Sequence, residues 1–215
     1  MSNQFALVSL LRTYLGEEVA DHIHSGQFKR GDGTFIDAVI WFCDLRNFTN
    51  FVDQNPPELV FQRLNSYFDV VGEAIDENGG EILKFMGDGI LAVFPIHSSS
   101  DGCEVANQAL AASRMALNRL GRLENAPGGP IEIGIGLHTG RVSFGNVGTE
   151  KRLDFTVIGG PVNTASRVEA LCKSLRKPLL MTEAFANLVC KHSLRCLGPH
   201  ELKGVSEAQI LYALE

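Results

Sequence analysis

Two apolar, strand-like runs of this 215-residue chain each end on an aspartate. The first run ends at Asp44 in F-C-D-L-R-N-F-T, and the second ends at Asp88 in L-K-F-M-G-D-G. A carboxylate at a strand end is held by packed backbone yet faces solvent, so two of them can bind the hard cations that carry phosphate. A stretch with helical spacing follows Asp44, and its first amides would be unpaired and ready for a triphosphate. This pattern favours nucleotide chemistry, although a helix cap at Asp44 and a simple turn at Asp88 are the alternative interpretation.

Length and composition fit one large globular domain. The chain is 45% apolar and 20% charged, which is ordinary for a soluble protein. Its net charge of −6 argues against a general nucleic-acid-binding protein, which would carry a basic patch. A membrane helix needs roughly 18 consecutive apolar residues, and the sequence has neither such a run nor a signal-peptide layout at its start. The five cysteines are odd in number and include no C-x-x-C pair, which predicts reduced thiols and a cytoplasmic location.

Hydrophobic periodicity predicts a mixture of helices and strands. Helices are expected at 4–24, directly after Asp44, at 58–77, at 103–123 and from Gly160 through Leu171. Strands are expected at 36–43, 81–86, 90–94, 131–137, 141–145 and 154–158, with a hairpin turn at 87–89 and a turn at Gly140. The tail, 178–214, is expected to form a strand, a helix and two strands that meet at a turn at Lys203-Gly204. Mixed elements and several hairpins favour an α+β sandwich over a parallel, doubly wound sheet.

Five segments in a fixed order resemble the catalytic domain of class III nucleotidyl cyclases. They are F-C-D-L-R-N-F-T, I-L-K-F-M-G-D-G-I-L-A-V-F, G-L-H-T-G-R-V, D-F-T-V-I-G-G-P-V-N-T-A-S-R and E-L-K-G. The resemblance divides the chain into a helical linker, 1–33, and a catalytic domain, 34–215. It implies a ferredoxin-like α/β sandwich with a mostly antiparallel sheet flanked by helices. It also implies a head-to-tail homodimer whose two active sites lie at the interface.

The resemblance implies a two-metal site and a set of phosphate contacts. Its metal ligands would be Asp44, the Leu45 carbonyl and Asp88, binding two Mg²⁺ or Mn²⁺ ions that activate the ribose 3′-hydroxyl and neutralise pyrophosphate. Substrate contacts are expected at four further positions: Arg141 and Lys203, which match terminal-phosphate contacts, and Phe48 and Thr49, which follow the metal-binding strand. Because basic residues at turns are routine, a purely structural role for Arg141 and Lys203 stays open.

Lys84 and Thr156 bear on the choice of purine. Adenine presents an acceptor at N1 and a donor at its 6-amino group, whereas guanine presents the opposite pair. Lysine can only donate, so Lys84 suits adenine. The family has lysine here in adenylyl cyclases and glutamate in guanylyl cyclases, usually with an aspartate companion that Thr156 replaces in this chain. Threonine at this position is typical of class IIIb, a subgroup often stimulated by bicarbonate or CO₂, but a strand threonine chosen for β-propensity is the alternative.

Asn163 and Arg167 lie four residues apart, hence on one face of a helix. They match the asparagine that orients the ribose and the arginine that stabilises charge developing on the α-phosphate, although an exposed polar face would look the same. A guanidinium fork suits a phosphoryl oxygen.

The predicted function is therefore that of an adenylyl cyclase in signal transduction, converting ATP to 3′,5′-cyclic AMP and pyrophosphate. The alternatives are a guanylyl cyclase and a catalytically silent nucleotide-binding regulatory module. No nucleic-acid partner and no membrane segment within this chain are expected.

Overall fold

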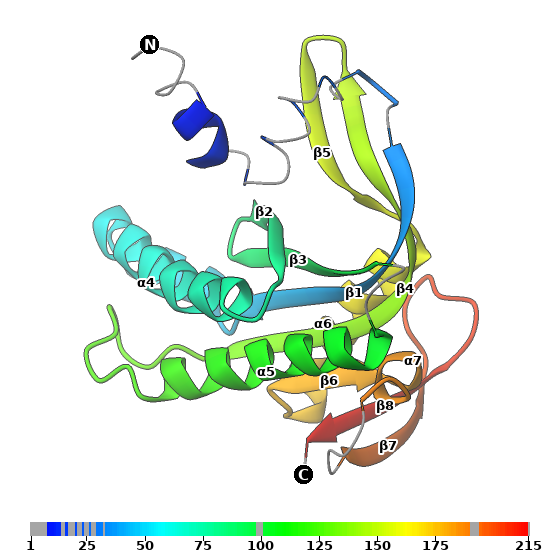
Figure 1. The fold of residues 1–215 in the computed structure, drawn as a ribbon. Coiled ribbons are helices and arrows are strands. Elements are labelled where there is room, and N and C mark those ends of the chain that lie inside the picture. The colour runs from blue at the N-terminus through cyan, green and yellow to red at the C-terminus, as the bar shows by residue number, and fades with distance from the viewer. Residues whose placement is uncertain are drawn as a thin grey trace.

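One mixed sheet with helices on both faces forms the core of the computed structural model (Figure 1). The structure describes residues 8–13, 16, 20, 23, 26, 29–31, 33–97, 101–189 and 194–214. Seven of its eight strands follow the order β2-β3-β1-β4-β6-β8-β7, and the eighth, β5, pairs with the far end of β4. The ladders are antiparallel except for β4 with β6. This confirms the α+β sandwich. Most of the predicted helix 4–24 lies outside the described residues, although 8–13 are helical.

The element bounds follow the predicted pattern closely. The strands are β1 Gly33–Leu45, β2 Glu81–Met86, β3 Gly89–Ile96, β4 Ile133–Thr149, β5 Arg152–Ile158, β6 Leu179–Thr182, β7 Leu194–His200 and β8 Gln209–Leu214. The helices are α3 Phe48–Gln54, α4 Pro57–Asp76, α5 Gly102–Gly121, α6 Gly160–Leu175 and α7 Glu183–Ala186. The hairpin turn at 87–89 and the strand, helix and two strands of the tail are confirmed.

Alternating side chains of β1 serve two different hydrophobic clusters. Val39, Trp41 and Cys43 are fully buried in the cluster that includes α4 and α5. Trp41 Nε1 donates a hydrogen bond to Ser113 Oγ of α5 at 2.8 Å. The opposite face carries Ala38 and Ile40, which pack with Ala165 of α6. Because successive strand residues face opposite sides, the side chain of Asp44 is on the α6 face.

Helix α6 lies unusually close to β4 because glycines replace side chains there. A Cβ added to Gly136 would come within 2.5 Å of both the Ala165 carbonyl oxygen and the Glu169 amide nitrogen. A Cβ added to Gly140 would meet Pro161 Cγ at 2.6 Å. The predicted turn at Gly140 is therefore wrong: β4 continues through it, with Gly140 opposite Ala38. This glycine serves a close approach rather than a reversal of the chain.

Two further findings concern the cysteines and the membrane. Cys43, Cys172 and Cys196 are free thiols, but Cys103 is disulfide-bonded, so the expectation of wholly reduced cysteines is wrong at that position. Among the described residues, no helix is both long enough and apolar enough to cross a membrane.

Substituting Gly136 should destabilise the fold through the α6 contact. Gly136→Ala places a methyl group against backbone that cannot rotate away, so we expect the free energy of unfolding to fall by roughly 1–3 kcal/mol. Urea unfolding measures this change. The control is Gly121→Ala, because a Cβ at Gly121 meets nothing within 4 Å. Equal stability of the two variants would contradict the close packing.

Candidate functional site

Asp44 and Asp88 are brought together by the pairing of β1 with β3. The register places Cys43 opposite Ile90, so the last residues of β1 lie beside the β2–β3 turn that carries Asp88. The two carboxyl groups lie close enough that Asp88 contributes to raising the pKa of Asp44. A Cβ added to Gly89 would lie 3.8 Å from Asp44 Oδ1, which shows how closely the turn approaches. The predicted pair of strand-end aspartates therefore forms one cluster.

The environment of this cluster favours a shared proton or a cation. Burial, followed by the hydrogen bond and the charge of Asp88, raises the pKa of Asp44 from 3.8 to about 7. Two carboxylates this close cannot both ionise without a compensating positive charge. A divalent cation would supply that charge in place of the proton.

The donor set fits Mg²⁺ or Mn²⁺ better than a metal held entirely by protein. Two carboxylates and the Leu45 carbonyl are hard oxygen ligands, and Mg²⁺ commonly takes one or two carboxylates together with water and substrate phosphates. Within the described ranges, no group of three or more His, Cys, Asp or Glu side chains could hold a metal ion. The site is therefore suited to an ion that arrives with a phosphate ligand.

A buried ion pair lies beside the aspartates. Arg46 Nη1 is 3.5 Å from Glu169 Oε1 of α6, and the two side chains are only 16% and 8% exposed. Burial, opposed by the charge of Arg46, raises the pKa of Glu169 to about 7, and the charges of Asp44 and Asp88 raise it further. Three carboxyl groups and one guanidinium thus share one region of the α6 face.

Lys84 faces the β4–β5 hairpin, where it forms an ion pair with Asp154. Thr156, its expected companion, lies two residues further along β5 on the same face as Asp154 and is half-buried. Lys84, Phe85 and Asp154 line a groove of about 1450 Å³ between β2 and β5. None of the described residues lining this groove is a predicted metal ligand. Among the described residues, one chain therefore separates the candidate base-binding residues from Asp44 and Asp88.

Asn163 and Arg167 both lie on α6, as predicted, and both are exposed. Their helix begins at Gly160, directly after β5, and its buried side includes Ala165 and Val168. Because α6 is fixed against the glycines of β4, these two side chains project from a rigid support.

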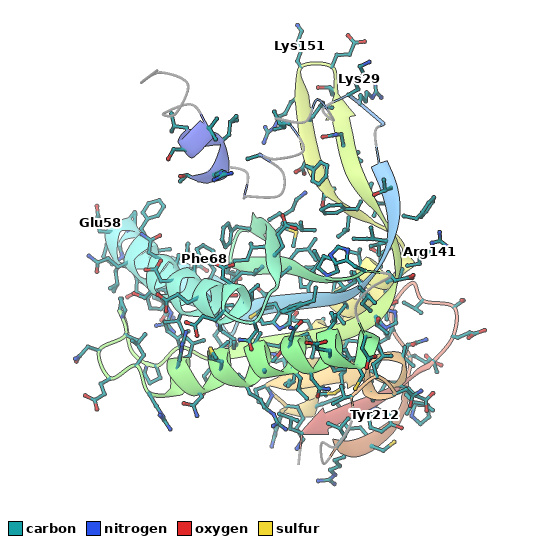
Figure 2. The ribbon with its side chains drawn as sticks, viewed as in Figure 1. Lys29, Glu58, Phe68, Arg141, Lys151 and Tyr212 are labelled. Carbon is teal, nitrogen blue, oxygen red and sulfur yellow. The ribbon has the colours of Figure 1, made fainter. Side chains whose placement is uncertain are left out.

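The remaining predicted substrate residues lie on three different elements. Arg141 is exposed on β4 (Figure 2), and its guanidinium carbon lies 5.3 Å from the centre of the Phe35 ring. Lys203 is exposed in the turn between β7 and β8. Phe48 begins α3 and packs against the core, whereas Thr49 beside it is exposed. In the part of the chain that the structure describes, no hydrogen bond or ion pair joins these four residues to Asp44 or Asp88.

Sequence reasoning missed Asp154, Arg46 and Glu169. Asp154 could have been found because Asp154 and Thr156 alternate with Phe155, which packs on Phe144 with ring centres 4.6 Å apart. The signal for the Arg46–Glu169 pair was the alternating glycines of the strand I-E-I-G-I-G-L, since glycine inside a strand often marks a close approach.

Comparison with known proteins gives one consistent family. The model of the "Adenylate and Guanylate cyclase catalytic domain" matches residues 33–215. An adenylate cyclase from Anabaena cylindrica is 38% identical over 186 residues, which cover 82% of this chain and 36% of that protein. A terminal-differentiation-specific adenylate cyclase from Dictyostelium discoideum is 33% identical over 191 residues, covering 85% of this chain and 9% of that protein. The chain thus spans about a third or less of these relatives.

Solved structures agree with this result. A bacterial light-regulated adenylyl cyclase superposes with a TM-score of 0.85 at 27% identity, covering 96% of this chain and 59% of that one. The adenylyl cyclase CyaB from P. aeruginosa gives a TM-score of 0.77 at 27% identity, covering 85% and 95% of the two chains. The guanylyl cyclase Cya2 gives 0.71 at 30% identity, covering 84% and 92%.

Without divalent cations, the stability of the fold should decrease as the pH rises from about 4 to about 7. The pKa values of Asp44 and Glu169 lie near 7 in the folded chain, above their ordinary values of 3.8 and 4.5. The folded state therefore retains about one to two protons that the unfolded state has lost over this range. Thermal unfolding in metal-free buffers of constant ionic strength measures the effect.

Added Mg²⁺ should raise the Tm more at pH 8 than at pH 5.5, because the ion competes with the proton on Asp44. Asp44→Asn should remove most of this dependence, whereas Asp53→Asn, an exposed acid on α3, should keep it. An unchanged response in Asp44→Asn would contradict the metal site.

Proposed function

Because this chain belongs to the family of adenylate and guanylate cyclase catalytic domains, we propose that it is an adenylyl cyclase. It would convert ATP to 3′,5′-cyclic AMP and pyrophosphate at the interface of a homodimer. The observation that carries the proposal is the facing pair Asp44 and Asp88, combined with Lys84 at the base-recognition position. This substrate fits a cytoplasmic, signalling role.

The reaction would join the ATP 3′-oxygen to the α-phosphorus while the bond to pyrophosphate breaks in line with it. Bound Mg²⁺ or Mn²⁺, two ions per site, would lower the pKa of the 3′-hydroxyl and neutralise the leaving group. Asp44, Asp88 and the Leu45 carbonyl would hold these ions. Asn163 would orient the ribose, and Arg167 would stabilise the charge that develops on the α-phosphate. Positioning and charge neutralisation supply most of the rate enhancement in such phosphoryl chemistry.

Contacts to the rest of the triphosphate would come from four residues. Arg141 and Lys203 would bind the terminal phosphates, since both are exposed cations, the first on β4 and the second in the turn between β7 and β8. Phe48 and Thr49 would lie beside the phosphates because they directly follow the metal-binding strand.

Shared active sites explain why one chain separates its two sets of functional residues. The groove lined by Lys84 lacks the metal ligands among its described residues, so a second copy would have to supply them. Large apolar side chains at this groove support such a partner: Phe85 is 53% exposed and Leu153 37%, and Met86, next to Phe85, is 39% exposed. A head-to-tail homodimer would cover them and complete two equivalent sites.

Selection of adenine would depend on Lys84 and Thr156. In the free chain Lys84 is paired with Asp154 at a partly exposed position, where an ion pair contributes little stability. The adenine N1 acceptor would therefore displace Asp154 easily. Thr156 would accept a hydrogen bond from the 6-amino group, as in class IIIb cyclases, and a bicarbonate response would follow from that likeness.

Guanylyl cyclase activity is the second candidate, because Thr156 can also donate a hydrogen bond and the guanylyl cyclase Cya2 is 30% identical. The test is turnover of ATP and GTP by purified protein, with and without bicarbonate. Lys84→Glu should lower the ATP-to-GTP ratio of kcat/KM about tenfold, since glutamate accepts from guanine N1–H. Asp154→Asn, which removes the intrachain partner alone, should keep the ratio. An unchanged ratio in Lys84→Glu would remove Lys84 from base recognition, and no product from either nucleotide would indicate a silent regulatory module.

Complementation tests the shared site. Asp44→Ala and Arg167→Ala should each abolish turnover, because they remove a metal ligand and the transition-state arginine. Equal mixing should restore about a quarter of the wild-type rate, since half of the dimers are mixed and each has one intact site. Gel filtration confirms assembly of each variant. Mixtures that stay inactive after subunit exchange would argue for sites within single chains.

A further inference from the structure

The Arg46–Glu169 ion pair connects the end of β1 to α6. Arg46 follows Asp44 by two residues, and its backbone amide donates to the Glu132 carbonyl at 2.9 Å, which fixes the chain at this point. Its side chain turns toward α6 and meets Glu169 at 3.5 Å. Glu169 lies two residues after Arg167 on the same helix. The pair therefore joins the strand that holds Asp44 to the helix that holds Asn163 and Arg167.

Gly134 provides the space for this pair. Gly134 is the cross-strand neighbour of Asp44 in the β1–β4 ladder. A Cβ added to it would lie 1.8 Å from Arg46 Nη2 and 2.6 Å from Glu169 Oε1. The ion pair therefore lies directly over the backbone that is paired with the metal-binding residue, so a shift of the pair would be transmitted to Asp44.

The surroundings hold the pair in one arrangement. Arg46 Nη2 and Glu169 Oε1 are buried and have no hydrogen-bond partner of their own, so each depends on the opposite charge. The carboxyl groups of Asp44 and Asp88 act electrostatically on Glu169, and Arg46 acts on both Asp44 and Glu169. One buried guanidinium thus offsets the negative charge on both sides of the gap between β1 and α6.

We propose that Arg46 and Glu169 are positioning residues that fix the metal-binding aspartates relative to the α6 face carrying Asn163 and Arg167. This rests on the proposed function, in which the aspartates of one chain serve one active site and its α6 serves the other. The pair consequently links the two sites of a dimer through the interior of each subunit.

The first experiment compares the metal requirement with stability. Arg46→Met and the double variant Arg46→Met/Glu169→Met are assayed over a range of Mg²⁺ concentrations, and their melting temperatures are measured. The double variant leaves no unpaired buried charge and should fold even if Arg46→Met does not. We expect the half-maximal Mg²⁺ concentration to rise about tenfold in the double variant. A folded double variant with wild-type Mg²⁺ dependence and kcat would overturn the proposal.

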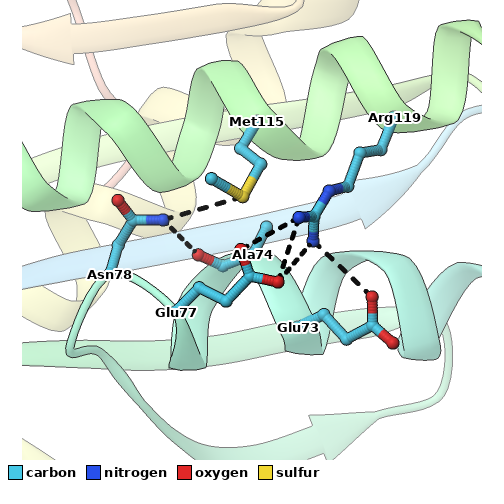
Figure 3. Close-up of polar contacts among 6 residues, drawn as sticks. All are labelled: Glu73, Ala74, Glu77, Asn78, Met115 and Arg119. Carbon is cyan, nitrogen blue, oxygen red and sulfur yellow. Dashed lines mark hydrogen bonds and ion pairs between the residues drawn. The ribbon is translucent and has the colours of Figure 1, made fainter.

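The matched control is an ion pair that joins two other elements. Arg119 of α5 contacts Glu77 at 2.9 Å and Glu73 at 3.5 Å, which connects α5 to α4 on an exposed face (Figure 3). Arg119→Met removes an interhelical ion pair in the same way but should leave the Mg²⁺ dependence unchanged. A Mg²⁺ shift in Arg119→Met as large as that in the double variant would show that any lost helix contact has this effect, and would overturn the proposal.

Mixed dimers distinguish the effect of the ion pair on the aspartates from its effect on α6. When the Arg46→Met/Glu169→Met pair is placed in the Arg167→Ala chain and mixed with Asp44→Ala, the intact site takes its aspartates from the chain that lacks the ion pair. That mixture should need more Mg²⁺. When Arg46→Met/Glu169→Met is placed in the Asp44→Ala chain and mixed with Arg167→Ala, the intact site takes only α6 from the chain that lacks the ion pair.

The second mixture should show a lower kcat at a normal Mg²⁺ requirement. Wild-type kcat there would refute the link to α6. Failure of the parent Asp44→Ala and Arg167→Ala mixture to complement would instead refute the shared site of the proposed function, whatever Arg46 does.

Discussion

The structure depends on the close contact between α6 and the glycine positions of β4. Gly136 and Gly140 leave room for the backbone of α6 and for Pro161 at its start. A side chain at either position would push the helix away from the sheet, and with it every group that α6 carries. Because backbone contacts of this kind are rigid, the helix serves as a fixed support for exposed side chains that have no packing of their own. Strand β1 is anchored on the sheet face opposite α6, where Trp41 donates a hydrogen bond to Ser113 of α5.

Helices and strands with a regular spacing of hydrophobic residues could be predicted from the sequence, and so could the pairing of Asp44 with Asp88. The alternation of 131–137 and the turn at 87–89 were each specified by residues next to one another in the chain. Gly140 was misread because the same residue type serves a turn or a close approach, and only the position of Pro161 in space distinguishes the two. Arg46–Glu169 and Lys84–Asp154 join residues far apart in sequence, and local patterns such as alternating glycines can mark a close approach but do not identify its partner.

Electrostatic compensation organises the α6 face. Asp44, Asp88 and Glu169 lie buried or partly buried near the cationic side chain of Arg46. Burial and the neighbouring carboxyl groups raise the pKa of Asp44 and of Glu169. Such an arrangement would be a liability in a purely structural region, because buried carboxylates destabilise a fold unless they are paired. It would be reasonable at a place that receives positively charged ions, which is the role proposed above for Asp44 and Asp88.

The contact between Lys84 and Asp154 has a consequence for how a ligand enters. A vacant recognition pocket with a bare ammonium group would attract any anion that fits, including free phosphate and unrelated carboxylates. Here the ammonium already has an internal partner, so an incoming acceptor at the proposed base-recognition position would exchange with a tethered but weakly held carboxylate. An incoming acceptor would therefore compete with the Asp154 carboxylate for the Lys84 ammonium. Because that ion pair is weak, a well-placed acceptor would replace the carboxylate, whereas one that cannot reach the ammonium would leave the pair intact.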